Sequence, residues 1–298
     1  TTTIYSVTAF MNNGCSNFDQ ITVYVNKLPS LDTINLKNSY CINSPDVPLL
    51  VNPTGGYFSG PGITNSIFSP SSLAPGTYTI KYIYSDTFTN TYSIFKDNFS
   101  FNKGWTGIGA GGWQIDITDS ISLCDGYSQN PKFDTSITKD NYILGTYIGK
   151  CYPNNFPGPV AYAVSPFIDC RGYSEIYLNF FSNSAFEGTK YDHASIEIFN
   201  KITLKWDTLY STNDANINEN HWTPRSFNIS QYADNNQFLK IRFGIGSTDS
   251  SGAYKGWKID DFEIIGKIKT VCTDSVEKTV TIYGLPNANA GPDITICK

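Results

Sequence analysis

The sequence predicts an all-β protein built from small β-sandwich modules in tandem, with a larger β domain inserted into one of them. Composition is the first indication, because 20 Tyr, 19 Phe, 24 Gly and 15 Pro with a single Met favour half-buried strands and tight turns over long helices. The second indication is a sequence phrase that occurs twice, over residues 15–29 and 272–286. The third is the alternation of apolar and polar residues through much of the chain, which is typical of strands.

Each copy of the repeated phrase contains a polar entry, an alternating strand and a Leu-Pro turn. The two copies read CSNFDQITVYVNKLP and CTDSVEKTVTIYGLP. Recurrence of one unit is typical of arrays of small modules, in which each module contacts its neighbours. We therefore expect residues 1–28 to be the C-terminal part of an immunoglobulin-like repeat, and residues 286–298 to be the start of the next one.

The module between these two pieces begins as an immunoglobulin-like sandwich over residues 29–95. Its clearest strand places four side chains on one face: Tyr78, Ile80, Tyr82 and Tyr84. The final strand of such a module appears only at 267–285. Residues 96–266 are therefore predicted to be inserted in one of its loops, where an insertion disturbs little backbone bonding. The alternative is that 267–285 belongs to a separate module whose first half is degenerate.

The cysteines favour disulfide bonds. By its position in the interrupted module, Cys41 is expected to bond to Cys272, and Cys15 and Cys297 are expected to pair with cysteines outside this sequence. Seven Cys with no CxxC spacing and only two His favour bridges in an oxidising, extracellular compartment over a zinc site.

The inserted segment is rich in short alternating stretches separated by Asn, Asp, Gly and Ser turns. We expect strands within 175–186, 193–200, 205–211, 225–230, 238–247 and 256–266. A domain of this length with many short strands suits a two-sheet jelly roll. Trp105 and Trp257 lie in Gly-Trp pairs at strand ends and are expected in its core.

Several functions are disfavoured by the composition. The net charge is −5 and the basic residues are scattered, which argues against a nucleic-acid partner. No apolar run approaches the length of a membrane span, so membrane insertion is not expected. Neither a GxSxG elbow nor another nucleophile motif is present, and we expect a protein that is not an enzyme.

The insert resembles the MAM-like or concanavalin-like jelly rolls of bacterial surface proteins. Four segments carry the resemblance: DNFSFNKGWT (97–106), VSPFIDCRGYSEIYLNF (164–180), YDHASIEIF (191–199) and GWKIDDFEI (256–264). The resemblance implies a structural Ca²⁺ with four candidate ligands: Asp97, Asp192, Asp260 and Asp261. The alternative is that these are ordinary solvated acids at strand ends. Where that family usually has Leu, this chain has Cys170, which suits a buried free thiol and leaves Cys124 and Cys151 as the disulfide pair of the insert.

The flanking modules resemble the PKD-like and immunoglobulin-like repeats of giant cell-surface adhesins that gliding bacteria display by type IX secretion. The segments are YSVTAFMNNGCSNFDQITVYVNKLP, TGGYFSGPGI and LPNANAGPDITIC. The resemblance implies a non-catalytic segment of an extracellular adhesin filament that attaches to surfaces or glycans and serves gliding motility. Its partners would be neighbouring repeats, surface polysaccharide or substratum, and motility and secretion machinery contacted through other regions. The alternatives are a carbohydrate-binding region of a secreted polysaccharide-degrading enzyme, or a self-assembling surface fibre.

Two further sets of residues are candidates for contact with sugars. Trp206 and Trp222 lie beside polar turns and can stack on a sugar ring, although packing in a core or at a sheet edge is the simpler interpretation. Four Asp-Ser/Thr-aliphatic sites resemble the O-glycosylation sequon of bacteria that carry such adhesins, and the same residues can form ordinary Asx-turns. The acceptor hydroxyls would be those of Thr33, Ser120, Thr208 and Ser275.

Overall fold

The structure, a computed structural model, describes most of the chain. The described residues are 2–12, 14, 16–109, 112–118, 123–124, 128–129, 131–136, 139–156, 161–188, 190–212 and 217–296. Cys15, Ser120 and Cys297 therefore lie outside the described residues. The described part is almost entirely β, with one short 3₁₀ turn at Pro70–Ser72 and one single-turn α-helix, α1, at Ser230–Ala233. The predicted all-β class is confirmed, and no described helix is long and apolar enough to span a bilayer.

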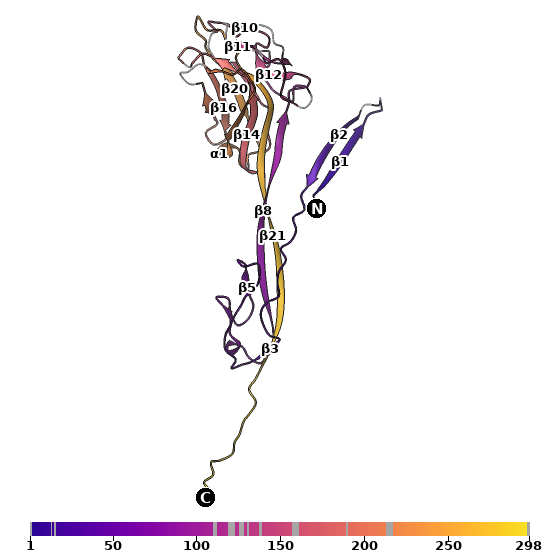
Figure 1. Cartoon of the computed structure of the whole chain (residues 1–298), viewed down its shortest axis with the longest axis vertical. Helices are drawn as coiled ribbons and strands as arrows, with labels where there is room; N and C mark the ends of the chain where they lie inside the picture. Colours follow the sequence, from indigo (N-terminus) through magenta and orange to yellow (C-terminus); the bar gives the residue numbers. More distant parts are fainter. Residues whose placement is uncertain are drawn as a thin grey trace. The chain divides into compact units, whose positions relative to one another are not determined.

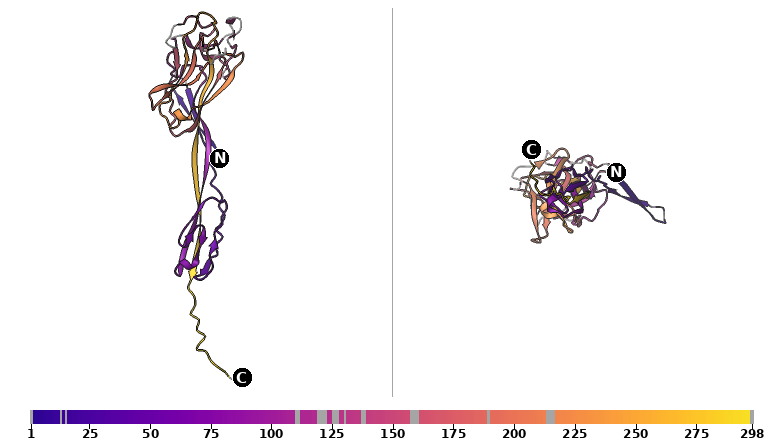
Figure 2. Two further views of the ribbon diagram at one scale, coloured as in Figure 1. Left: turned by 90° about the vertical axis from the view of Figure 1, so that its left-hand side faces the viewer. Right: turned by 90° about the horizontal axis from the view of Figure 1, so that it is seen from below.

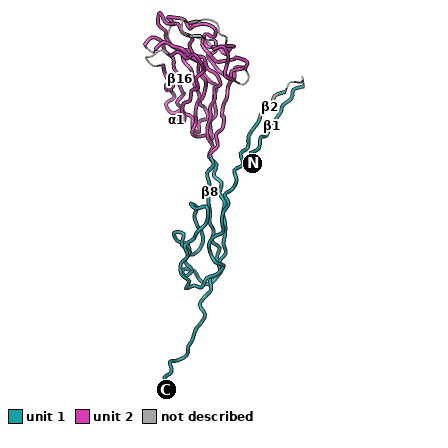
Figure 3. Tube along the Cα trace, in the orientation of Figure 1, with its two compact units in different colours: residues 1–88, 269–298 teal, residues 89–268 magenta. Residues whose placement is uncertain are grey.

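The chain divides into two compact units, shown in different colours in Figure 3. Unit 1 is discontinuous and contains Thr1–Phe88 and Lys269–Lys298, whereas unit 2 contains Thr89–Ile268. Two long strands, β8 (Gly76–Asp97) and β21 (Lys258–Tyr283), contribute residues to both units. The expected boundaries at 95/96 and 266/267 fall inside these strands, because each strand continues past the position where the sequence suggested a break.

Unit 1 consists of a hairpin and a small sandwich of short strands. The hairpin strands β1 (Thr3–Phe10) and β2 (Ser16–Val23) pair antiparallel with each other, and Figure 1 shows them as a two-stranded ribbon. The other strands confined to this unit are β3 (Ser39–Cys41), β4 (Val47–Pro48), β5 (Tyr57–Ser59), β6 (Ile63–Thr64) and β7 (Ile67–Phe68). In the sandwich, β3 pairs parallel with the end of β21, and β5 pairs antiparallel with β8.

One apolar core holds the sandwich of unit 1 together. Its buried residues are Ile34, Leu36, Leu49, Val51, Phe68, Ile80, Tyr82, Val280 and Ile282. Ile80 and Tyr82 come from β8, and the partly buried Tyr78 and Tyr84 pack against the same core, which confirms the predicted alternation of that strand. Val280 and Ile282 come from β21, so side chains from both ends of the long intervening segment share one core.

The predicted Cys41–Cys272 disulfide is wrong, because both residues are free thiols. Cys41 lies opposite Tyr283 in the β3–β21 ladder. Cys272 precedes Tyr283 by eleven positions in the same strand, which is roughly 36 Å at the usual rise of a strand. Next to Cys272, the hydroxyl of Thr273 lies 2.8 Å from that of Ser85 in β8. The thiols are therefore separated because β21 is a single 26-residue strand and not a short closing strand.

Unit 2 is a β-sandwich whose strands gather into one body, as the left view of Figure 2 shows. Its first sheet has the order β19-β14-β21-β12-β9 and its second has the order β13-β20-β16-β17. The first sheet contains β9 (Trp113–Ile117), β12 (Tyr142–Thr146), β14 (Ser174–Ser182), β19 (Thr223–Asn228) and the first part of β21. The second contains β13 (Ala161–Val164), β16 (Ala194–Asn200), β17 (Lys205–Ser211) and β20 (Ile241–Ile245). Short pairs complete the unit: β10 (Leu123–Cys124) with β11 (Ser128–Gln129), and β15 (Ala185–Phe186) with β18 (Ile217–Asn218).

The space between the two sheets is filled by large aromatic and branched side chains. Trp105 and Trp257 are buried there, as the sequence predicted, and both pack on the ring of Phe243. Cys170 is also buried and has a free thiol whose pKa burial raises to about 12. A disulfide joins Cys124 and Cys151, with their Cα atoms 5.5 Å apart; this is the pair expected within the insert.

Candidate functional site

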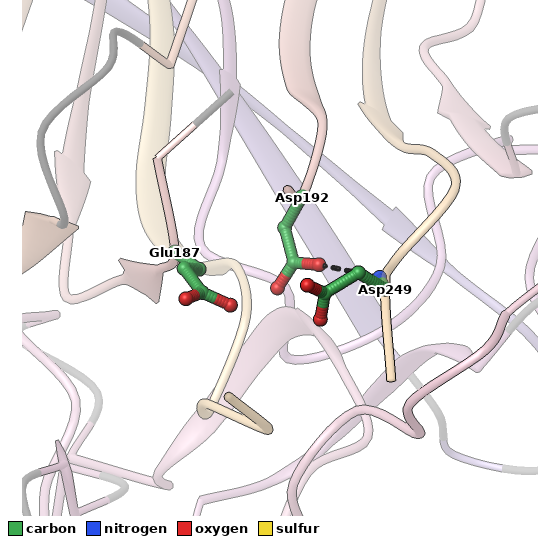
Figure 4. Close-up of side chains that lie close together, drawn as sticks. All are labelled: Glu187, Asp192 and Asp249. Atoms are coloured by element: carbon green, nitrogen blue, oxygen red, sulfur yellow. Dashed lines mark hydrogen bonds between the residues drawn. The ribbon is translucent and has the colours of Figure 1, made fainter. Parts of the chain in front are cut away.

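Three carboxylates gather at one end of unit 2, from two loops that are distant in the chain. Glu187 directly follows β15, Asp192 precedes β16, and Asp249 lies in the loop after β20. One carboxylate oxygen of each residue lies within 4.8 Å of the others. Figure 4 shows the three side chains together, with the backbone N–H of Asp249 donating to Asp192. We call these residues the acidic cluster.

Asp192 is the buried member of the acidic cluster, with only 1% of its surface exposed. The hydroxyl of Tyr152 donates to Asp192 Oδ2, and the Asp249 N–H donates to Oδ1 at 3.1 Å. Burial raises the pKa of Asp192, and the charge of Asp249 raises it further. A cation bound between the carboxylates would oppose both effects.

The donor set of the acidic cluster fits a hard cation. Its ligands are carboxylate oxygens, which Ca²⁺ and Mg²⁺ prefer, and it contains no thiolate or imidazole. Ca²⁺ takes about six to eight oxygen ligands, so backbone carbonyls and water would have to complete the coordination. The cluster can therefore hold a metal ion such as calcium.

Only one of the four predicted calcium ligands belongs to this cluster. Asp192 is a member, whereas Asp97, Asp260 and Asp261 are not, because the acidic cluster is the sole group of three candidate ligands among the described residues. Asp97 is buried and accepts hydrogen bonds from the Phe99 N–H and the Trp105 indole N–H, both at 2.9 Å. The predicted four-aspartate site is therefore wrong in composition.

Asp260 and Asp261 share a different partner. Asp260 accepts the N–H and the hydroxyl of Thr135, each at 2.7 Å, and the same hydroxyl lies 3.1 Å from Asp261. Burial raises the pKa of Asp260 to about 6. These contacts satisfy the two carboxylates within the protein.

Sequence reasoning missed Glu187 and Asp249. Glu187 lies in the same polar loop as Asp192, FEGTKYDH, and Asp249 is a single acid in the loop STDSSG. No spacing rule relates the two loops. Only the pairing of β16 with β20 brings the loop before β16 to the loop after β20.

A second candidate surface lies on the second sheet of unit 2. The guanidinium of Arg242 in β20 lies 3.6 Å from the ring centroid of Tyr162 in β13 and 4.2 Å from that of Trp206 in β17. Glu197 in β16 accepts the Arg242 Nε–H at 2.9 Å and the Tyr162 hydroxyl at 3.0 Å. We call these four residues the aromatic–arginine cluster.

The aromatic–arginine cluster faces away from the sandwich core and is fixed in place. Neighbours of its members along each strand, such as Ala163, Ile196 and Phe243, are buried in the core, so the members themselves project from the opposite face. The side chains of Arg242 and Glu197 are 19% and 12% exposed. Stacking on both sides of the guanidinium and two hydrogen bonds to Glu197 restrict the rotamers of all four residues.

The two tryptophans predicted to stack on sugars lie on different sheets. Trp206 belongs to the aromatic–arginine cluster and also contacts the edge of Phe199, with ring centroids 5.5 Å apart. Trp222 precedes β19 and donates its indole N–H to the Phe133 carbonyl at 2.7 Å. It adjoins a surface pocket that Phe133, Thr135, Lys139 and neighbouring residues line. The two rings therefore do not form one platform.

The described O-glycosylation candidates are accessible. Thr33, Thr208 and Ser275 are all exposed. Asp274 accepts the backbone N–H of the next residue, Ser275, at 2.7 Å, whereas an Asx-turn would accept the N–H two residues on. Thr208 lies opposite Glu197 in the β16–β17 ladder, and directly opposed residues project to the same face.

Comparisons with known proteins show the fold only. No protein family and no curated protein sequence matches the chain. Among solved structures, the chain is similar to the K3 adhesin domain of Lys-gingipain from Porphyromonas gingivalis, with 16% identity over 58% of this chain and 99% of that one and a TM-score of 0.29. It is also similar to SGBP-B from a complex xyloglucan utilization locus in Bacteroides uniformis, with 11% identity over 90% and 80% and a TM-score of 0.31.

A further similar structure is the CBM22-1–GH10 part of endo-1,4-beta-D-xylanase 10B from Clostridium thermocellum, complexed with xylohexaose. The identity is 12%, the TM-score is 0.28, and the match covers 58% of this chain. The chain spans 28% of the length of that structure. These values establish a distant β-sandwich likeness and carry no argument about ligands.

Proposed function

We propose that this chain is a non-catalytic segment of a large secreted cell-surface adhesin, and that unit 2 binds polysaccharide. The observation that carries the proposal is the aromatic–arginine cluster, where two aromatic rings, a guanidinium and a carboxylate are held rigidly on the outer face of a sheet. Rigid aromatic groups beside fixed hydrogen-bonding groups suit a ligand that has both apolar faces and hydroxyls, as a sugar ring has.

The charge of the cluster favours a neutral polysaccharide. Glu197 pairs with Arg242, so the cluster carries no net charge, and the whole chain carries −5. A polyanionic glycan would meet a protein of the same sign without a free cationic group at this place. A neutral glycan with many hydroxyls meets no such repulsion.

The hairpin of unit 1 supports the tandem arrangement. Its strands pair with each other, and several large apolar side chains are exposed, among them Ile4, Val7, Phe10 and Ile21, each above 60%. Exposed apolar faces of this kind indicate a missing partner. We propose that the partner is the preceding part of the same repeat, in accord with the expectation that residues 1–28 complete a module.

We further propose that Ca²⁺ occupies the acidic cluster as a structural ion. It would connect two loops of unit 2 at one end of the second sheet. A glycan on Thr208 would cover the face that Glu197 occupies, so O-glycosylation there would block binding of an external polysaccharide to the aromatic–arginine cluster.

The test is affinity electrophoresis of the whole chain in gels containing xylan, xyloglucan or alginate. The expected result is retardation by a neutral polysaccharide and its loss in the Trp206→Ala variant. Trp222→Ala is the matched control, since it removes the other half-buried tryptophan of unit 2 and leaves the cluster intact. The binding proposal is contradicted if none of the three polymers retards the protein. It is also contradicted if Trp206→Ala leaves the retardation unchanged.

The secretion route and the role in gliding motility follow from the resemblance of the repeats alone. Sequencing the gene on both sides of this segment tests the proposed secretion route and the role in gliding motility. Many more repeats of the Cys15–Pro29 type favour an adhesin, a catalytic domain favours a secreted polysaccharide-degrading enzyme, and filaments of purified protein in electron micrographs favour a self-assembling fibre.

A further inference from the structure

Two lysine side chains of unit 2 are completely buried. Lys255 and Lys258 are both 0% exposed. Removing an ammonium group from water is costly, and burial lowers the pKa of Lys258 well below its usual range and that of Lys255 to about 8. A neutral amine is a nucleophile, so the chemistry open to each lysine depends on the groups that its nitrogen contacts.

The two amines differ in their partners. Lys258 Nζ donates to the backbone carbonyls of Thr146 and Lys255, both at 2.5 Å. Lys255 Nζ donates to the backbone carbonyl of Glu219 and to the side-chain Oδ1 of Asn183. Asn183 is itself 3% exposed. The hydrogen bond to Oδ1 holds the Lys255 amine against a carboxamide carbon, an electrophile that Lys258 lacks.

The surroundings of Asn183 exclude water and supply one carboxylate. Its chain neighbours Ser182 and Ser184 are 1% exposed. Glu219 Oε2 accepts the Ser182 hydroxyl and the Ser184 N–H, each at 2.7 Å. The Glu219 carboxylate is thereby fixed to the residues on both sides of Asn183, and its charge also acts on Lys255.

We propose that Lys255 and Asn183 are joined by an intramolecular isopeptide bond. The Nζ–Cγ bond forms, the Cγ–Nδ2 bond breaks, and one proton of the amine passes to the leaving nitrogen, so that ammonia is released. The products are a secondary amide and ammonia, and no oxidant or cofactor is needed. Glu219 carries the proton from Nζ to Nδ2, and the hydrogen-bonded placement of amine and amide supplies the proximity that the reaction requires.

The bond would connect two neighbouring strands of the first sheet. Asn183 directly follows β14 and Lys255 precedes β21, and these strands pair antiparallel at Ser182 and Ile259. The closed segment spans a sequence separation of 72 residues. It contains the strands β16, β17 and β20 and three members of the aromatic–arginine cluster, Glu197, Trp206 and Arg242, so the crosslink would fasten that region. The proposal does not depend on what unit 2 binds.

The test is the intact mass of the whole chain after reduction and denaturation. We expect a mass lower than that of the sequence by about 17 Da, the mass of one ammonia. A protease digest should contain a branched peptide that includes residues 183 and 255, with no cleavage after Lys255 by trypsin. A mass equal to that of the sequence, or linear peptides with an unmodified Lys255, overturns the proposal. So does a branched peptide whose fragments assign the link to other residues.

Substitutions distinguish the crosslinking reaction from the mere burial of a lysine amine. Lys255→Met should have the mass of its own sequence, whereas the matched control Lys258→Met, which removes an equally buried amine, should keep the deficit of about 17 Da. Glu219→Gln should reduce the crosslinked fraction severalfold in freshly purified protein whose circular dichroism shows the β fold. An undiminished fraction in Glu219→Gln overturns its role in proton transfer.

Discussion

Arg242 and Tyr162 form the closest cation–ring contact among the described residues, with the guanidinium carbon 3.6 Å from the ring centroid. Tyr162 and Arg242 lie on neighbouring strands, β13 and β20, and Trp206 closes the other side of the guanidinium from β17. The arrangement depends on Glu197, which neutralises the arginine and orients it through Nε–H and the terminal nitrogen.

We predict that Glu197→Gln destabilises unit 2 by about 3 kcal/mol, because it leaves a largely buried guanidinium without its carboxylate. Urea unfolding followed by tryptophan fluorescence measures the change, since all five Trp lie in this unit. Glu175→Gln is the control, because its pair with Lys267 is 36–44% exposed and should contribute less than about 1 kcal/mol. Equal effects of the two substitutions would contradict the prediction.

The position of Tyr162 also depends on a glycine. A Cβ on Gly107 would lie 2.0 Å from the backbone oxygen of Tyr162, and Gly107 has φ +80°. We predict that Gly107→Ala destabilises unit 2 severalfold more than Gly109→Ala, whose φ is +89° and whose Cβ would meet nothing within 4 Å. The second variant reports the cost of the backbone conformation alone, about 1 kcal/mol. Thermal unfolding of both variants measures the difference, and similar melting temperatures would show that the close approach is tolerated.

Calcium is predicted to stabilise unit 2 through the acidic cluster. Addition of millimolar CaCl₂ to chelator-treated protein should raise the melting temperature by several degrees, because the ion relieves the repulsion among three carboxylates and binds only the folded chain. Asp249→Asn should abolish this rise. Asp261→Asn should preserve it, since Asp261 lies outside the cluster. Melting that is insensitive to both EGTA and CaCl₂ would rule out the ion.

Asp260 is predicted to make unit 2 less stable as the pH rises from about 4 to about 6. Its folded pKa of about 6 exceeds the ordinary value of 3.8, so the folded state binds a proton that the unfolded state has released in this interval. The stability contributed by the protonated group is complete below the unfolded pKa and is lost as the pH rises through the folded pKa; the shift corresponds to about 3 kcal/mol. Asp260→Asn lacks this component, so the difference between wild-type and variant unfolding free energies should change with pH across pH 4–7. A pH-independent difference would contradict the assignment.

Local pattern accounts for most of the strands. Alternation places Tyr78, Ile80, Tyr82 and Tyr84 on the core side of β8, and Gly-Trp pairs place Trp105 and Trp257 in the core of unit 2. Such predictions succeed because the side-chain period of a strand is a property of neighbouring residues. The buried free thiol of Cys170 was implied instead by the resemblance to jelly rolls that usually have Leu at this position, which Cys can fill.

Residue contacts across the sheets were not predictable in the same way. The sequence placed Asp97, Asp260 and Asp261 around one calcium, whereas in the structure Trp105 and Thr135 satisfy them. The predicted bond between Cys41 and Cys272 likewise assumed a short final strand. Both errors come from the assumption that residues at equivalent sequence positions lie at equivalent places in space. Strand length and register decide where such residues lie.

The sequence by itself determined the class of this protein, the position of most strands and the repeated phrase on both sides of the insert, because these depend on short-range periodicity and turn residues. Tertiary structure decided which groups meet: Glu187 with Asp192 and Asp249, Arg242 between Tyr162 and Trp206, and Lys255 against Asn183. Each of these groups joins residues from strands or loops that are distant in the chain, apart from Glu187 and Asp192, which share one loop. Such contacts form only when the hydrogen-bonded register of the sheets and the packing of the core place those segments side by side.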